Sequence, residues 1–269
     1  MTDDAGGYEL LDLRPGEHRI ALTHPSYLRR ELAVVVAAGR PVEAPPVTLL
    51  GGDVDQDGRI GLADANRIAL SWYAVPGDAI WSPEMDVTDD ARIDLLDAVA
   101  VRYNWGRTAD GGGQADDAPA ASGPTAPEAR IRLVAEPAAA DGSVVVRVLV
   151  DGAADLNAAR LVLGYDASRL RLSGLRPGGA WDPAHRLVLV ERVDARAGRA
   201  ELAVAQTRPA PPISGTAELA RFQVRPDGGR AVLVRLVEAE LRGADPTRAE
   251  PLPFRPAPPL RVDPRADPR

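Results

Sequence analysis

A 33-residue internal repeat constrains the fold of this 269-residue chain more than any other feature of the sequence. The stretch "DVDQDGRIGLAD" at residues 53–64 returns as "DVTDDARIDLLD" at residues 86–97, and each copy leads into an apolar run that ends in Trp. Carboxylates crowded this closely repel one another unless a positive charge lies between them. The repeat therefore predicts two matching loop–helix units, each built around a cation.

The spacing of oxygen donors in each copy is typical of a calcium loop. Carboxylates stand at loop positions 1, 5 and 12 of both copies, and position 3 is Asp in the first and Thr in the second. A backbone carbonyl is available at position 7, and an apolar residue follows at position 8. Calcium takes six to eight oxygen ligands, which explains the crowding. The alternative is a solvated acidic turn, which accounts for a single loop of this kind better than for a matched pair. We therefore expect two Ca²⁺ ions.

Each loop precedes a helix-like stripe with apolar residues at the spacing i, i+3, i+4 and i+7. The two stripes are Ala65, Ile68, Ala69 and Trp72, and Ala98, Val101, Arg102 and Trp105, in which Arg102 is the exception. We expect these stripes to pack between the two helices. A sugar-stacking role for the tryptophans is the weaker alternative.

Charge and composition limit the function classes. Residues 51–106 carry eleven acidic residues and four Arg, so this segment holds all of the net charge of −7. An acidic segment suits a cation site, and the absence of a basic patch disfavours nucleic-acid binding. The chain has no Cys, and no apolar run approaches the roughly 18 residues of a transmembrane helix. The first residues do not resemble a signal peptide, so we expect the protein to be either cytoplasmic or part of a longer chain that is truncated here at its N-terminus.

The remainder of the chain is predicted to be β. Residues 8–50 contain four alternating segments, including "YELLDL" and "PPVTLL", and from residue 130 seven or more short alternating runs are separated by Gly- and Pro-rich turns. The latter spacing predicts a two-sheet sandwich, which "LRV" at residues 260–262 would close. Between these parts, residues 108–128 contain no bulky apolar residue and are predicted to form a flexible linker.

The paired calcium loops without an entering helix, joined by "YAVPGDAIWSPEMD", resemble a dockerin domain. The resemblance implies ten metal ligands, with the carbonyl serving at each Arg. In loop one they are Asp53, Asp55, Asp57, Arg59 and Asp64, and in loop two they are Asp86, Thr88, Asp90, Arg92 and Asp97. Loop two departs from the pattern in two places. Thr88 is a weaker donor, and Ala91 replaces the usual Gly at a cost of about 1 kcal/mol if it is left-handed.

The phrases "LGYDASRL" and "GTAELARFQV" resemble those of a cohesin domain, and "LRPGEHRIALTHPSYLRRELAVVVAAG" resembles the back half of a prealbumin-like (carboxypeptidase-regulatory-like) module. The expected fold class is thus multi-domain and mainly β: a partial β-sandwich, a small all-α dockerin, a linker and a cohesin-like sandwich of jelly-roll type. The expected boundaries are residues 1–50 for the prealbumin-like module, 51–107 for the dockerin, 108–128 for the linker, 129–263 for the cohesin-like sandwich, and 264–269 for a disordered tail.

The function predicted from these resemblances is a non-catalytic, calcium-binding scaffold or adaptor for dockerin–cohesin assembly. The three histidines are scattered, and no segment remains for a catalytic domain. The resemblance implies cohesin- or dockerin-bearing partners, an extracellular or cell-surface location and a link to polysaccharide degradation. The alternatives are a carbohydrate-binding surface module, which the four aromatics of the sandwich disfavour, and the non-catalytic end of a longer glycoside hydrolase.

Three leucines, Leu62, Leu95 and Leu96, precede the last ligand of each loop, where dockerins commonly present partner-contact residues. Burial within the dockerin is one alternative. The others are contacts with residues 8–50, with a cohesin on another chain, or with the chain's own cohesin, which a flexible linker spanning about 25 Å permits. Packing against residues 8–50 is favoured here because that connection is the shortest.

Overall fold

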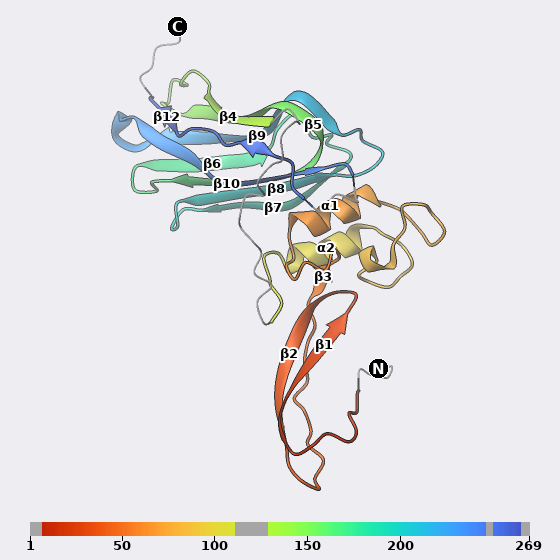
Figure 1. Cartoon of the computed structure of the whole chain (residues 1–269). Helices are drawn as coiled ribbons and strands as arrows, with labels where there is room; N and C mark the ends of the chain where they lie inside the picture. The colour runs from red at the N-terminus through yellow and green to blue at the C-terminus, as the bar shows by residue number, and fades with distance from the viewer. Residues whose placement is uncertain (1–6, 111–128, 246–249, 265–269) are drawn as a thin grey trace.

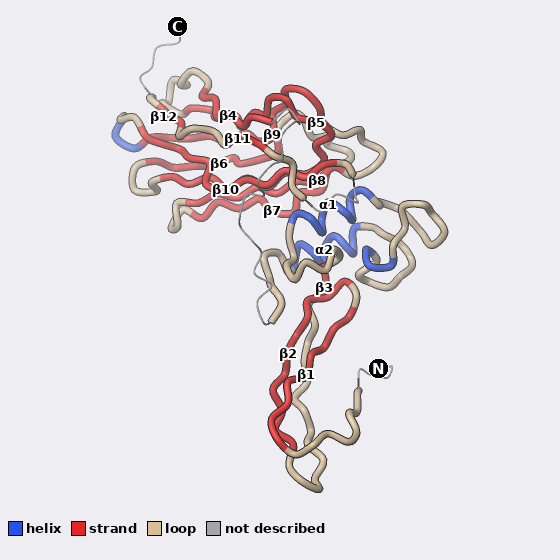
Figure 2. The backbone as a smooth tube through the Cα atoms, in the orientation of Figure 1, coloured by secondary structure: helices blue, strands red, loops and turns tan. Residues whose placement is uncertain are grey.

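The computed structural model of the chain describes residues 7–110, 129–245 and 250–264. In chain order it has a projecting β-hairpin, a compact pair of short helices and a β-sandwich, and the helices lie against the sandwich (Figure 1). Figure 2 shows that strands dominate. The expectation of a mainly β chain with a sandwich after residue 129 is therefore confirmed.

The N-terminal part is one small sheet. Strands β1 (Gly16–His24) and β2 (Ser26–Val36) form an antiparallel hairpin, and β3 (Gly51–Asp53) pairs with the start of β2. The segments "YELLDL" and "PPVTLL", which the sequence predicted as strands, are not strands here. Within residues 7–50 no second sheet covers the hairpin, so most of its side chains are exposed or half-buried. The structure shows a three-stranded sheet at this place, not a two-layer partial sandwich.

The central part contains helices α1 (Leu62–Leu70) and α2 (Leu95–Tyr103) and a short 3₁₀ turn, η1 (Pro83–Met85). It also includes β3, so it is not purely helical. Gly52 allows β3 to approach α2 closely: its φ is +120°, and a Cβ there would lie only 3.0 Å from the Cα of Val101. The predicted apolar stripes are buried at Ala65, Ile68, Ala69, Ala98 and Val101, as expected for packing between helices.

The sandwich has nine strands. They are β4 (Ala129–Ala135), β5 (Val144–Tyr165), β6 (Leu170–Pro177), β7 (Arg186–Asp194), β8 (Arg199–Gln206), β9 (Ile213–Pro226), β10 (Val232–Gly243), β11 (Phe254–Arg255) and β12 (Leu260–Val262), with a 3₁₀ turn, η2 (Asp227–Gly229), after β9. The predicted closing strand at residues 260–262 is present and pairs with β10.

Strand β5 joins the two layers because its halves lie in different layers of one continuous nine-stranded sheet. Its first half pairs with β4 and β9, and its second half pairs with β8 and β10. The register of the β5–β9 pair shifts between Val150 and Leu156, where the strand bends. The inward residues of both layers form one apolar core around Trp181 and Phe222. The alternating runs "SVVVRVLV" and "ARLVLGY" predicted two separate short strands where this single strand of 22 residues runs. The alternating runs did not include β6.

The predicted linker falls mostly on residues 111–128 and the predicted tail mostly on residues 265–269, and both lie outside the described residues. Within the described part of the chain, no helix is long and apolar enough to cross a membrane.

Candidate metal centre

The 33-residue sequence repeat is also a repeat of structure. Helices α1 and α2 begin and end at equivalent positions, after extended N-cap residues Gly61 and Asp94. The left-handed backbone positions match as well, with φ of 58° at Gln56 and 57° at Asp89. The two loops therefore follow the same path despite their different residues.

Backbone hydrogen bonds hold the two units together reciprocally. Ile60 of loop one donates to the carbonyl of Arg107 at 2.9 Å and accepts from the N–H of Gly106 at 2.8 Å, both just after α2. Ile93, the equivalent residue of loop two, donates to Ala74 at 3.0 Å and accepts from Tyr73 at 2.8 Å, both just after α1. Each loop is thus anchored to the end of the other helix, and both isoleucines are fully buried.

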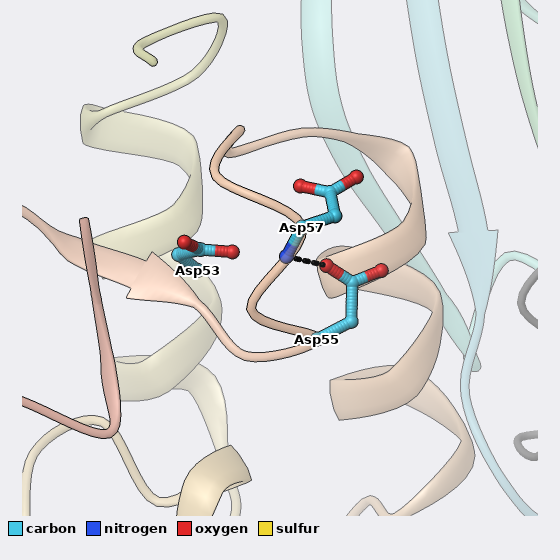
Figure 3. Close-up of side chains that lie close together, drawn as sticks. All are labelled: Asp53, Asp55 and Asp57. Atoms are coloured by element: carbon cyan, nitrogen blue, oxygen red, sulfur yellow. Dashed lines mark hydrogen bonds between the residues drawn. The ribbon is translucent and has the colours of Figure 1, made fainter. Parts of the chain in front are cut away.

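Loop one brings three carboxylates together at the end of β3. One oxygen from each of Asp53, Asp55 and Asp57 lies within 4.8 Å of the others (Figure 3). The N–H of Asp57 donates to Oδ1 of Asp55 at 3.3 Å, which turns the chain back over Asp53. Asp53 is only 3% exposed, and its Oδ1 has no hydrogen-bond partner within the described residues. A buried, unpartnered carboxylate oxygen among like charges is what a cation would satisfy.

The electrostatics of loop one agree with this geometry. Burial, followed by the charges of Asp57 and Asp55, raises the pKa of Asp53 to about 6. Burial is also the main cause that raises the pKa of Asp57 and that of Asp64, which lies well above its usual range. These shifts describe carboxylates in need of compensation, which a proton or a divalent cation can supply.

Asp64 fixes the loop to the start of α1. Its Oδ1 accepts from the N–H of Val54 at 2.8 Å and of Asp55 at 3.3 Å, and its Oδ2 accepts from Gly61 at 2.7 Å. Asp97 does the same in loop two, with Oδ1 accepting from Thr88 and Oδ2 accepting from Asp94. The last predicted ligand of each loop is therefore in place beside the loop.

Loop two is satisfied by its own backbone. Both oxygens of Asp86 accept backbone N–H groups, from Asp90 at 3.2 Å and from Ala91 at 2.8 Å. The Thr88 hydroxyl donates to Oδ1 of Asp97 at 3.1 Å, and burial raises the pKa of Asp97. Across the described ranges, the three-carboxylate cluster occurs in loop one and not in loop two. Ala91 has a φ of 63°, the left-handed value at which an alanine was expected to cost stability.

The two arginines at loop position 7 take the expected place in the chain. The N–H of Arg59 donates to Asp57 at 2.8 Å, and the N–H of Arg92 donates to Asp90 at 3.0 Å. These bonds set the same turn in both loops. Ligation by the two carbonyls stays a prediction.

The three leucines separate into two classes. Leu62 is 1% exposed and lies in the apolar cluster that joins α1 to the sandwich, whereas Leu95 and Leu96 are 58% and 55% exposed. Packing of Leu95 and Leu96 against residues 8–50 is therefore wrong in this structure. The hairpin contacts the helical part through other residues: Leu28 is fully buried, and Tyr27 Oη donates to the carbonyl of Val87 at 3.1 Å. That contact lies beside β3, at the start of the helical part. The short connection from residues 8–50 therefore places the hairpin next to β3 and not next to Leu95 and Leu96.

Sequence reasoning missed the contact between α1 and the sandwich. Ala203 and Ala205 of β8 point outward, alternate with the inward Leu202 and Val204, and are nevertheless fully buried in one cluster with Ile68 of α1. The signal was available in "AELAVAQ", because a strand that is apolar on both faces is covered on both faces.

Comparison with known proteins gives a limited match. No protein-family model matches the chain. The Cellulosomal-scaffolding protein B of Acetivibrio thermocellus is 25% identical over 113 residues, which are 40% of this chain and 15% of that protein. The Cellulosomal-scaffolding protein A of the same species is 25% identical over 113 residues, and the match covers 6% of its length. The similarity thus spans a small part of either relative.

Among solved structures, a type II cohesin domain from the cellulosome of Acetivibrio cellulolyticus is 14% identical, with a TM-score of 0.42, over 51% of this chain and 95% of that one. The non-cellulosomal cohesin of the archaeon Archaeoglobus fulgidus is 17% identical, with a TM-score of 0.40, over 49% of this chain and 87% of that one.

Proposed function

We propose that this protein is a non-catalytic, calcium-binding scaffold or adaptor that assembles proteins through dockerin–cohesin type contacts. The observation that carries the proposal is the repeated loop–helix unit with the buried, unpartnered Asp53 oxygen among Asp55 and Asp57. The similarity to two cellulosomal scaffolding proteins supports the scaffold part. The proposal includes an extracellular or cell-surface setting linked to polysaccharide degradation.

Calcium fits the donor set of loop one. Asp53, Asp55, Asp57 and Asp64 would supply hard oxygen ligands, and Arg59 would add its carbonyl, as Ca²⁺ prefers. A second ion would bind Asp86, Thr88, Asp90, Asp97 and the Arg92 carbonyl, at a site where each Asp86 oxygen already accepts a backbone N–H group. We therefore propose two ions with loop one as the tighter site.

The exposed residues of α2 are the proposed contact for a cohesin-bearing partner on another chain. Leu95, Leu96 and Val99 are each about half exposed, and Tyr103 is more exposed still. Solvent-facing helix positions normally carry polar residues, so this apolar set favours a protein contact.

The carbohydrate-binding alternative receives less support. Trp181 and Phe222 are buried in the sandwich core, and the Trp181 indole N–H donates to the carbonyl of Leu219 at 2.8 Å. Neither ring can therefore stack on a sugar.

Surface plasmon resonance of the full chain against immobilised cohesin-bearing and dockerin-bearing proteins, with calcium and with EGTA, tests the proposal. We expect calcium-dependent binding to a cohesin-bearing partner that the pair Leu95→Asp and Leu96→Asp abolishes while calcium binding stays intact. The exposed substitution Val35→Asp on the hairpin is the matched control. Binding to cellulose alone, unaffected by EGTA or by these changes, would contradict the proposal.

A further inference from the structure

The outward face of β7, β8 and β5 contains an apolar seat, which α1 occupies over β8 and β5 and which α2 touches at β7. The seat consists of Leu189, Ala158, Ala203 and Ala205, all of which are buried in one cluster with Leu62 and Ile68. Small side chains on the sheet let a helix approach closely, and Figure 1 shows α1 beside β8, the strand of the sandwich that it contacts most extensively. The same face becomes charged beyond the seat, where Arg160 bonds Glu201 at 2.7 Å and Glu201 bonds Arg192 at 2.9 Å. The apolar seat is therefore limited to the area under the helix.

A buried amide pair connects the helix to the seat. The Asn66 side-chain N–H of α1 donates to the carbonyl of Gly243 at 2.9 Å, and its Oδ1 accepts from Nδ2 of Asn157 at 2.9 Å. Asn157 also donates to the carbonyl of Gln206 at 3.0 Å. Asn66 and Asn157 are 5% and 2% exposed. Because a buried amide without partners is costly, this network favours a helix that carries an amide at this one position.

Helix α2 cannot make these bonds. The residue equivalent to Asn66 in the repeat is Val99, which offers no donor or acceptor in its side chain. A helix with Val at this position would leave the Gly243 carbonyl and one Asn157 N–H without partners. The sheet face thus distinguishes the two halves of the repeat by chemistry as well as by shape.

We propose that the partner of this sheet face is α1 of the same chain, selected by the Asn66–Asn157 pair, so that the face is closed to loop–helix units of other chains. This inference rests on the proposed function in one respect, that the sandwich acts as an acceptor for such units. The inference adds that the loop–helix unit bound by the sandwich is the one that contains α1 of the same chain.

The test uses the full chain with a protease site placed within residues 111–128 and cleaved after folding in calcium. We expect the two fragments to elute together in size-exclusion chromatography. The Asn66→Val variant, which makes α1 like α2, should weaken their association at least tenfold, and Ala203→Glu should abolish it. The reciprocal change Val99→Asn on the exposed helix is the matched control and should alter the association less than twofold. Fragments that separate without any substitution, or that associate equally well in both variants, would overturn the proposal.

A second measurement tests closure to other chains. Cleaved protein labelled within residues 1–110 should exchange with unlabelled cleaved protein but should not bind to the intact chain, and uptake by the intact chain would overturn the proposal. The β-sheet signal in circular dichroism reports sandwich folding in every variant. Terbium titration of the same samples separates the two claims: association without lanthanide binding contradicts the calcium role and leaves the self-occupied face standing.

Discussion

The two loops of the repeat have the same backbone path and different side-chain environments. In loop one, Asp53 keeps a buried oxygen without a partner, and in loop two, Asp86 gives both oxygens to backbone N–H groups. Gly58 occupies the left-handed turn of loop one, and Ala91 occupies it in loop two. The comparison teaches that matched spacing sets the turn, whereas readiness for a cation depends on which oxygens the protein leaves unsatisfied.

The largest expected effect is the loss of stability when calcium is removed. Residues 51–107 are a small acidic segment, and a ligand that binds the folded state at a thousand times its Kd stabilises it by about 4 kcal/mol. We expect EGTA to remove much of the helical circular dichroism signal or to lower its melting temperature, while the β-sheet signal of the sandwich persists. A helical melting curve that is the same with and without calcium would contradict the assignment of the two loops as calcium sites.

Single-ligand substitutions should sharpen the ranking of the loops. Asp53→Ala should eliminate the tight site and leave the weak one, with the first calcium binding about a hundredfold more weakly in calorimetry. Asp86→Ala should leave the tight site unchanged, because loop two binds second. Asp89→Ala, which changes an acidic residue outside the predicted ligand set, is the control for net charge. The reverse order of the two losses would refute the ranking.

Acidity should affect loop one in opposite directions with and without calcium. The folded pKa of Asp53 is about 6, above the ordinary value of 3.8, so its contribution to stability in the calcium-free protein is full below 3.8 and is lost as pH rises through 6. Calcium must displace that proton, so its affinity should fall about tenfold per pH unit below 6. Urea unfolding in EGTA and calcium titrations from pH 4.5 to 7.5 check both directions. Calcium-free stability that rises with pH over this range would contradict the assignment.

The smallest effect concerns the left-handed turn. Ala91→Gly should stabilise loop two by about 1 kcal/mol, and Gly58→Ala should destabilise loop one by a similar amount, because Gly tolerates positive φ without a Cβ clash. Thermal melting in saturating calcium measures both. Equal melting temperatures for all three proteins would show that the loops relax to accommodate the side chain.

Much of the fold followed from spacing in the sequence. The repeat predicted both helices and both loops, because acidic residues at fixed positions and apolar residues at helical spacing each leave a local signal. Alternation predicted most strands of the sandwich. It could not predict that residues 144–165 form one strand, because the bend between Val150 and Leu156 resembles a turn between two strands.

The contacts between distant segments were harder to predict. Leu62 and Leu95 are equivalent in the repeat, yet Leu62 is buried and Leu95 is exposed, because α1 packs against β5, β8 and β10 of the sandwich whereas α2 contacts it mainly at β7. The two strands of the hairpin were predicted correctly. Alternation alone also predicted strands at "YELLDL" and "PPVTLL", which are not strands in the structure. Asn66 carries no local signal for its role, since its partners Gly243 and Asn157 lie far away in the sequence.

The most direct test of the central claim is a calcium titration followed by ¹H–¹⁵N NMR of the wild-type protein. The amides of Gly58 and Ala91 occupy the same turn in the two loops and report each site separately. If loop one is the tighter site, the Gly58 resonance shifts during the first equivalent of calcium and the Ala91 resonance shifts during the second. Movement of Ala91 first, or no movement of either amide, would contradict it.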